Sequence, residues 1–198
     1  MRRHWRSLAA VLCLLAVAAV CRRAMKPRVR GELSEAERAV VAAFSSGTLS
    51  RESPIRVAFQ ESLARPEQVG APLQPSPFRF EPRIQGTAVW AAPDRIEFRP
   101  AERLPDGQAY AASLDLSALF PEGKAPLARF DFAFSTLRQS FDVAVEGLQS
   151  ADATDVKRQA LVGRLVTADV EDVLGVEKVL RASHNGRDLP VSWVHETN

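Results

Sequence analysis

The chain has very little cysteine: only Cys13 and Cys21 among 198 residues, both near the amino terminus. Everything after Cys21 therefore lacks the thiols needed for a disulfide framework or a cysteine-ligated metal site. The sequence also has no Gly-x-Ser-x-Gly motif, which would place a nucleophilic serine on a tight turn, and no glycine-rich phosphate-binding loop. These absences predict that the chain is not an enzyme and holds no cofactor.

Histidine and acidic residues form no catalytic or metal-binding pattern. His184 and His195 are separated by a turn and a predicted short strand, with no third ligand at helical or hairpin spacing, so we expect no zinc site. The clustered acidic residues are explained as favourable charges at the starts of helices, where the backbone dipole is positive. They are Glu35, Glu37, Asp169, Glu171 and Asp172.

Positive charge is scarce in most of the chain, although the formal net charge is +2. Eight Lys and Arg residues, the last of them Arg30, precede the first acidic residue, Glu32. The remainder has 18 basic and 24 acidic residues, which is a net charge of −6. Phosphate binding needs a basic face, so the sequence predicts that nucleic acid is not a partner.

Residues 1–21 predict an export signal or a membrane or lipid anchor. Arginines in the first six residues precede an apolar run from Leu8 to Val20, which is short for a spanning helix. Three alternatives stay open: a lipoprotein signal with lipid on Cys21, an uncleaved membrane anchor, and ordinary cleavage near Ala16 to Ala18. Val20 weighs against the first, because a small residue is expected before the lipid-bearing cysteine. All three export the domain to the periplasm or cell surface, and the first two attach it to the membrane through its amino terminus.

The basic, unpatterned residues 22–33 predict a tether between the membrane and the fold. Ser34 and Glu37 then form a capping box at the start of a helix. The predicted helix has an apolar face of Ala36, Val40, Val41 and Phe44, and Ser45 to Gly47 ends it. We expect this short helix to pack against the neighbouring β-domain.

The stretch from Ile84 to Leu116 predicts a β-hairpin around a tight turn at Ala92 to Asp94. In its second run, apolar and charged residues alternate, which is typical of a strand with one buried and one solvent-facing side. Ile96 and Phe98 are predicted on the buried, dry face, and Arg95, Glu97 and Arg99 on the solvent-facing, wet face. The only tyrosine, Tyr110, is expected to bury its ring and bond backbone through its hydroxyl, as in the tyrosine corner of Ig-like sandwiches. The predicted core residues are Trp90, Phe98, Tyr110 and Phe132.

Alternating runs continue along the chain from Pro54 to Leu137. Prolines lie between the runs or at their ends, where a missing amide does least harm to a sheet. Six or so short strands with Pro- and Gly-rich turns are typical of an Ig-like antiparallel β-sandwich. The sequence therefore predicts a mainly β protein, with the amino-terminal helix and the sandwich together spanning residues 34–138.

Residues 139–198 predict a second, incomplete β-domain with one helix. Phe141, Val143 and Val145 alternate with polar residues, and Leu161, Gly163 and Leu165 lie on one side of the next strand. We expect a helix from Thr167 to Leu180, then a tight turn at Asn185-Gly186 and a short strand from Val191 to Val194. The apolar faces of this unit have too little in the unit itself to pack against.

Three stretches of the sequence together resemble the opening of bacterial alpha-2-macroglobulin family proteins. They are AFSSGTLSRESPIRVAF (43–59), FRFEPRIQGTAVWAAPDRIEFRPAERLPDGQAY (78–110) and FDVAVEGLQSADATDVKRQALVGRLVTADVEDVLGVEKVL (141–180). The resemblance implies an exported protein, often a lipoprotein, with a bacterial Ig-like first domain followed by macroglobulin-like β-sandwiches. It also implies that residues 139–198 are part of such a sandwich, and that the bait segment and thioester of the family lie outside this chain.

Two functions are expected from these observations. In the first, the chain is the amino-terminal structural module of an envelope-anchored macroglobulin-like protease inhibitor, giving spacing and rigidity rather than catalysis. Its partners are then the remaining macroglobulin-like domains and, through the full-length protein, proteases. In the second, the chain is a free-standing Ig-like cell-surface module that recognises a protein or glycan through its loops.

Overall fold

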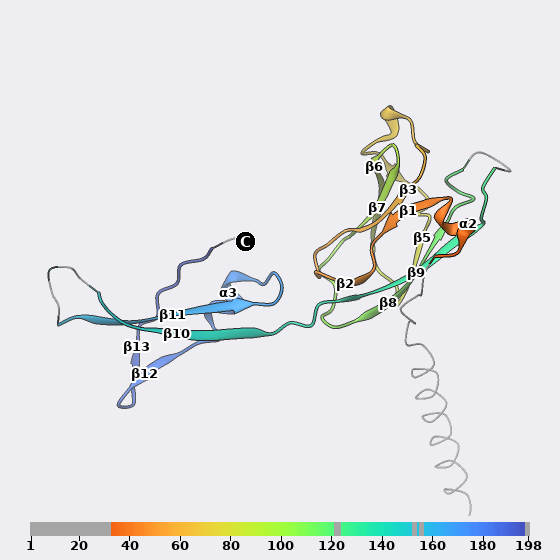
Figure 1. Cartoon of the computed structure of the whole chain (residues 1–198). Coiled ribbons are helices and arrows are strands. Elements are labelled where there is room, and N and C mark those ends of the chain that lie inside the picture. Colours follow the sequence, from red (N-terminus) through yellow and green to blue (C-terminus); the bar gives the residue numbers. More distant parts are fainter. Residues whose placement is uncertain (1–32, 121–123, 152–153, 155–156, 197–198) are drawn as a thin grey trace, which may run out of the picture. The chain divides into compact units, whose positions relative to one another are not determined.

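The computed structural model describes residues 33–120, 124–151, 154 and 157–196, and it is mainly β (Figure 1). The chain divides into two compact units, of which the first ends at Thr136 and the second begins at Leu137. Residues 1–21, including Cys21, and all of the predicted tether except Leu33 lie outside the described residues. Leu33 packs against the core of the first unit.

Helix α2 (Glu35–Arg38) begins with the predicted capping box. The Glu37 amide donates to Ser34 Oγ at 3.3 Å, and the Ser34 amide donates to Glu37 Oε2 at 2.9 Å. The predicted length of the helix is wrong, because Val41–Phe44 forms strand β1 instead. The physical reason is that these residues pair with a neighbouring strand, where a β-branched valine packs well.

The first sheet of the sandwich has the strand order β1-β3-β7-β6-β4. Strands β6 and β7 form the hairpin predicted around Ala92 to Asp94, with Trp90 opposite Ile96. Strand β3 pairs antiparallel with β7 and places Ile55 opposite Phe98. The bounds are β3 (Ile55–Phe59), β4 (Pro72–Leu73), β6 (Gly86–Ala92) and β7 (Arg95–Pro100), with a 3-10 turn η1 (Pro66–Gln68) before β4.

The second sheet has the strand order β2-β9-β8-β5. Its bounds are β2 (Gly47–Leu49), β5 (Phe78–Glu81), β8 (Ala109–Asp115) and β9 (Arg129–Thr136). Strand β2 runs parallel to the end of β9, whereas the other pairs in this sheet are antiparallel. The chain thus leaves the first sheet after β1 and joins the second through β2.

Aromatic rings from both sheets meet in the core of the sandwich. Phe80 of β5 lies against Phe98 of β7 with ring centroids 4.7 Å apart, and Phe44 of β1 lies edge-on to Phe130 of β9 at 5.2 Å. These pairs join strands of different sheets, so each ties the two layers together. Each of the four core residues named from the sequence is at most 4% exposed; they are Trp90, Phe98, Tyr110 and Phe132.

The second unit is built on a two-stranded antiparallel ribbon of β10 (Phe141–Ser150) and β11 (Gln159–Thr167). Helix α3 (Val173–Glu177) is shorter than the predicted helix, because β11 continues to Thr167 and Asp172 caps the helix by accepting from the Gly175 amide at 2.8 Å. A small hairpin, β12 (Ala182–His184) and β13 (Arg187–Leu189), follows.

The Asn185-Gly186 turn forms as predicted, with φ of 50° and 73° at its two residues. The strand that follows the turn is β13, however, and the predicted strand Val191 to Val194 does not form. Pro190 explains the difference, because a proline has no amide to continue the ladder.

Candidate functional site

The two histidines of the second unit lie in different places, and each contacts a single polar neighbour. His184 Nε2 lies 3.1 Å from Asn185 Nδ2, and His195 Nε2 lies 3.0 Å from Glu177 Oε1. Across the residues that the structure describes, no group of three or more His, Cys, Asp and Glu side chains could hold a metal ion. The same part of the chain contains no helix long and apolar enough to cross a membrane.

Glu97 corrects the prediction that every charged residue of β7 lies on a wet face. Its side chain is only 7% exposed, because two arginines cover it: Arg99 Nε donates to Oε1 at 2.6 Å and Arg56 Nε donates to Oε2 at 3.2 Å. Burial opposes ionisation, but the hydrogen bonds and charges of the two guanidinium groups outweigh it and lower the pKa of Glu97. Arg56 comes from β3, which pairing with β7 places beside Glu97.

Tyr110 does not form the predicted tyrosine corner. Its ring stacks on Phe134 with centroids 5.2 Å apart, and burial raises the pKa of its hydroxyl. No hydrogen bond joins this hydroxyl to any described residue. The structure also leaves no buried side-chain oxygen or nitrogen without a partner within the described ranges. An unpartnered oxygen must therefore be exposed, so the small accessible part of Tyr110, 3% of the residue, includes its hydroxyl oxygen.

A cleft of about 300 Å³ lies beside Tyr110, which we call the Tyr110 cleft. One wall is the β5–β6 connection, residues 82–85, and the other is the β7–β8 connection, residues 102–108. Four aliphatic or proline side chains and five polar or charged ones complete the lining; they are Pro82, Ile84, Leu104 and Pro105, then Arg83, Gln85, Glu102, Arg103 and Gln108. Sequence reasoning missed this cleft, because its walls are loops that only the fold brings together.

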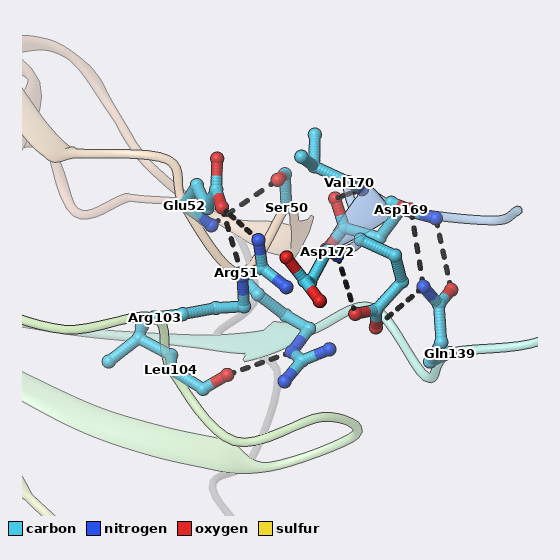
Figure 2. Close-up of polar contacts among 10 residues, drawn as sticks. Ser50, Arg51, Glu52, Arg103, Leu104, Gln139, Asp169, Val170 and Asp172 are labelled. Carbon is cyan, nitrogen blue, oxygen red and sulfur yellow. Dashed lines mark hydrogen bonds and ion pairs between the residues drawn. The ribbon is translucent and has the colours of Figure 1, made fainter. Parts of the chain in front are cut away.

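Polar contacts fasten the β7–β8 wall to the rest of the sandwich (Figure 2). Arg51 Nε donates to the Leu104 carbonyl at 2.9 Å, and the Leu104 amide donates to the Arg51 carbonyl at 3.0 Å. Arg103 Nε donates to Glu52 Oε1 at 2.9 Å. Thr136 Oγ1 holds the end of the same loop by donating to the Pro105 carbonyl at 2.6 Å. These contacts fix one side of the Tyr110 cleft.

A separate network in the second unit is built around Gln139 (Figure 2). Its amide pairs with the Asp169 backbone: Gln139 Nε2 donates to the Asp169 carbonyl at 3.2 Å and the Asp169 amide donates to Oε1 at 3.1 Å. Gln139 Nε2 also donates to Glu171 Oε1 at 2.8 Å. These contacts hold the segment after β11 against the start of β10, so Asp169 and Glu171 have structural contacts there.

One side of the β10–β11 ribbon is apolar and exposed, and we call it the ribbon face. Its members follow from strand alternation and pairing, in which Val143 lies opposite Leu165 and Leu148 lies opposite Leu161. Five of its large side chains remain 46–69% exposed, whereas Leu165 is half-buried; the five are Phe141, Val143, Val145, Leu148 and Leu161. Val176 of helix α3 and Val179, two residues after the helix ends, line a pocket of about 270 Å³ at the Phe141 end.

Comparisons with known proteins assign no family to the chain. No family model matches the sequence, and no curated protein matches it. Among solved structures, L,D-transpeptidase 3 from Mycobacterium tuberculosis in complex with a faropenem-derived adduct is 16% identical with a TM-score of 0.33, over 55% of this chain and 40% of that one.

Two further solved structures are similar to the same degree. An L,D-transpeptidase from Mycobacterium smegmatis is 16% identical with a TM-score of 0.33, over 54% of this chain and 42% of that one. A second structure of L,D-transpeptidase 3 from M. tuberculosis is 13% identical with a TM-score of 0.33, over 75% of this chain and 54% of that one. The chain therefore spans about half or less of these enzymes, and a likeness at this TM-score assigns no activity to it.

Proposed function

We propose that this chain is the amino-terminal structural module of an exported, membrane-anchored, alpha-2-macroglobulin-like protease inhibitor. In this role the module gives spacing and rigidity and performs no catalysis. Its partners are the other macroglobulin-like β-domains, and it meets proteases only as part of the complete inhibitor. The proposal rests on the resemblance of residues 43–59, 78–110 and 141–180 to that family, together with one structural observation in the second unit.

The observation that carries the proposal is the exposed ribbon face. The ten residues of β10 span about 33 Å, and a two-stranded ribbon is about 10 Å wide, so the face covers roughly 300 Å². Exposed apolar patches of this size are often functional. An isolated two-stranded ribbon is also marginally stable in water and needs a further layer against its apolar side. Another β-layer of a macroglobulin-like sandwich supplies such a cover.

The first unit supports the mechanical part of the proposal. Its two sheets are joined by pairs of aromatic rings, and such close-packed interiors resist deformation. Its arginine and carboxylate contacts, such as Arg103 with Glu52, connect loops or neighbouring strands. A domain of this kind suits a rigid spacer between a membrane anchor and the following domains.

Site-specific photo-crosslinking in the source cells tests the proposal. A benzoylphenylalanine at Val145 is expected to crosslink to macroglobulin-like β-domains, encoded in the same reading frame or in the adjacent gene. The matched control is the same probe at Arg164, on the opposite side of the ribbon, which is expected to give no such crosslink. A reading frame and neighbouring genes without sandwich repeats, a bait-like loop or a thioester cysteine would contradict the proposal.

The second candidate function is a free-standing Ig-like surface module that recognises a protein or glycan. The Tyr110 cleft favours it, because the cleft lies between two loops of the sandwich and contains an unpartnered hydroxyl. Absence of a Val145 crosslink to any macroglobulin-like domain, combined with binding at the cleft, would make this second function the better explanation.

A further inference from the structure

We propose that the Tyr110 cleft binds a short peptide segment, which places an aliphatic side chain in the cleft and a backbone carbonyl on the Tyr110 hydroxyl. The inference does not depend on the macroglobulin-like role, since every residue that carries it belongs to the first unit. It assigns a binding site to the loop end of the sandwich formed by the β5–β6 and β7–β8 connections.

The unpartnered hydroxyl is the first argument. The rest of Tyr110 is buried and its ring is held in place by stacking on Phe134, so the hydroxyl is presented at a fixed position. No fully buried side-chain oxygen or nitrogen of the described residues lacks a partner, so this unpartnered hydroxyl oxygen reaches the surface, where a ligand can take the place of solvent. A ligand carbonyl could accept a hydrogen bond from this hydroxyl without requiring any movement of the core.

The fixed walls are the second argument. Two backbone hydrogen bonds bring the loops into place: the Ala101 amide donates to the Gln85 carbonyl at 2.9 Å, and the Leu104 amide donates to the Arg51 carbonyl at 3.0 Å. Binding to such a cleft costs little loop ordering, which is a large part of the entropy lost on association. Small-ligand sites in proteins are usually preformed in this way.

The residues that line the cleft favour a peptide as the ligand. The aliphatic side chains of Ile84 and Leu104 and two prolines favour an apolar group, and the volume of about 300 Å³ lies at the lower end of ligand sites. Arg83 and Glu102 add opposite charges on facing loops, which suits the donors and acceptors of a peptide backbone. A glycan is less well matched, because the only aromatic ring in the lining belongs to Tyr110 and its face is covered by Phe134.

The test uses the full 198-residue chain, kept in solution with a nonionic detergent and labelled with ¹⁵N. Titration with the blocked peptide Ac-Ala-Leu-Ala-NH₂ is expected to shift amide signals of the two cleft walls, with a dissociation constant in the millimolar range. Ac-Ala-Ser-Ala-NH₂ is expected to bind more weakly because it lacks the aliphatic group. Maltose serves as the glycan probe.

Tyr110→Phe removes the hydroxyl and keeps the ring, so near-ultraviolet circular dichroism should show an intact core. It is expected to weaken peptide binding by about two- to tenfold, the value of one hydrogen bond. Ser113→Ala removes a hydroxyl from the same strand and should leave the affinity unchanged. Equal affinity in wild type and Tyr110→Phe, shifts outside the cleft, no shifts at all, or tighter binding of maltose than of the peptide would each overturn the proposal.

Discussion

Replacement of Trp90 by alanine is the most direct test of the sandwich core. Trp90 lies in β6, is 4% exposed and packs against Phe59 with ring centroids 6.0 Å apart. Removing the indole leaves a cavity that the aromatic and β-branched neighbours fill only in part. Large-to-small changes of this kind cost about 3–5 kcal/mol. This is a large share of the roughly 5–15 kcal/mol by which such domains are stable.

The single tyrosine of the chain makes the measurement specific to the first unit. Tyr110 lies in the sandwich core, so the tyrosine contribution to the ultraviolet spectrum, separated from the tryptophan bands by second-derivative analysis, follows the unfolding of that unit in urea. With a denaturant slope of about 2 kcal/mol per molar, Trp90→Ala should lower the unfolding midpoint by about 2 M. Trp90→Phe, which keeps an aromatic ring, should lower it less.

Trp193→Ala is the matched control for this experiment. Trp193 lies in the second unit, where its ring stacks on His195 with centroids 6.1 Å apart. Its removal should leave the tyrosine-detected transition unchanged. A Trp90→Ala midpoint within about 0.3 M of wild type would correspond to well under 1 kcal/mol. Such a result would refute the assignment of Trp90 to a packed core.

Three further predictions concern a charge, a glycine and the anchor. Arg99 and Arg56 lower the pKa of Glu97 in the folded state, so their contact with it stabilises the protein above the ordinary glutamate pKa of 4.5, and this stabilisation is lost as the pH falls through the lower pKa of the folded state. Glu97→Gln should therefore make the urea midpoint less dependent on pH between pH 3 and 6. A pH dependence equal to that of the wild type would disprove this. A β-carbon at Gly86 would collide with the Arg99 carbonyl oxygen, so Gly86→Ala should cost about 1–3 kcal/mol. An unaltered urea midpoint would show that the two strands are not so close. Clickable palmitate should label the wild type and not Cys21→Ser; an unlabelled wild type would favour an uncleaved peptide anchor.

Local alternation was enough to predict most of the sandwich strands. In β3, β8 and β9 the inward residues recur at every second position, and the structure buries the same residues; Ile55, Val57 and Phe59 in β3 are examples. The Ala92 to Asp94 turn and the Ser34 capping box were also readable from the sequence. These features involve residues close together in the chain, so their physical causes lie within the segment itself.

The Tyr110 cleft and the Glu97 contacts were not predictable in this way. The cleft needs the β5–β6 and β7–β8 loops side by side, and Glu97 is buried partly by Arg56, which is 41 positions away in the chain. No periodicity encodes such distances, because they depend on which strands pair. The unpaired Tyr110 hydroxyl has the same origin, since a sequence shows a lone tyrosine but not what lies within reach of its oxygen.

Side-chain periodicity and turn chemistry are local properties of the chain. They are therefore enough to predict the β class, the alternation of core residues along the strands and the apolar character of β10. Tertiary structure decided that Val41–Phe44 is a strand, since its pairing with β3 outweighs a helical pattern of apolar residues. It also decided the parallel pairing of β2 with β9, which joins residues more than eighty positions apart. Both outcomes depend on backbone hydrogen bonds between distant segments, and these form only when the two sheets close over a common core.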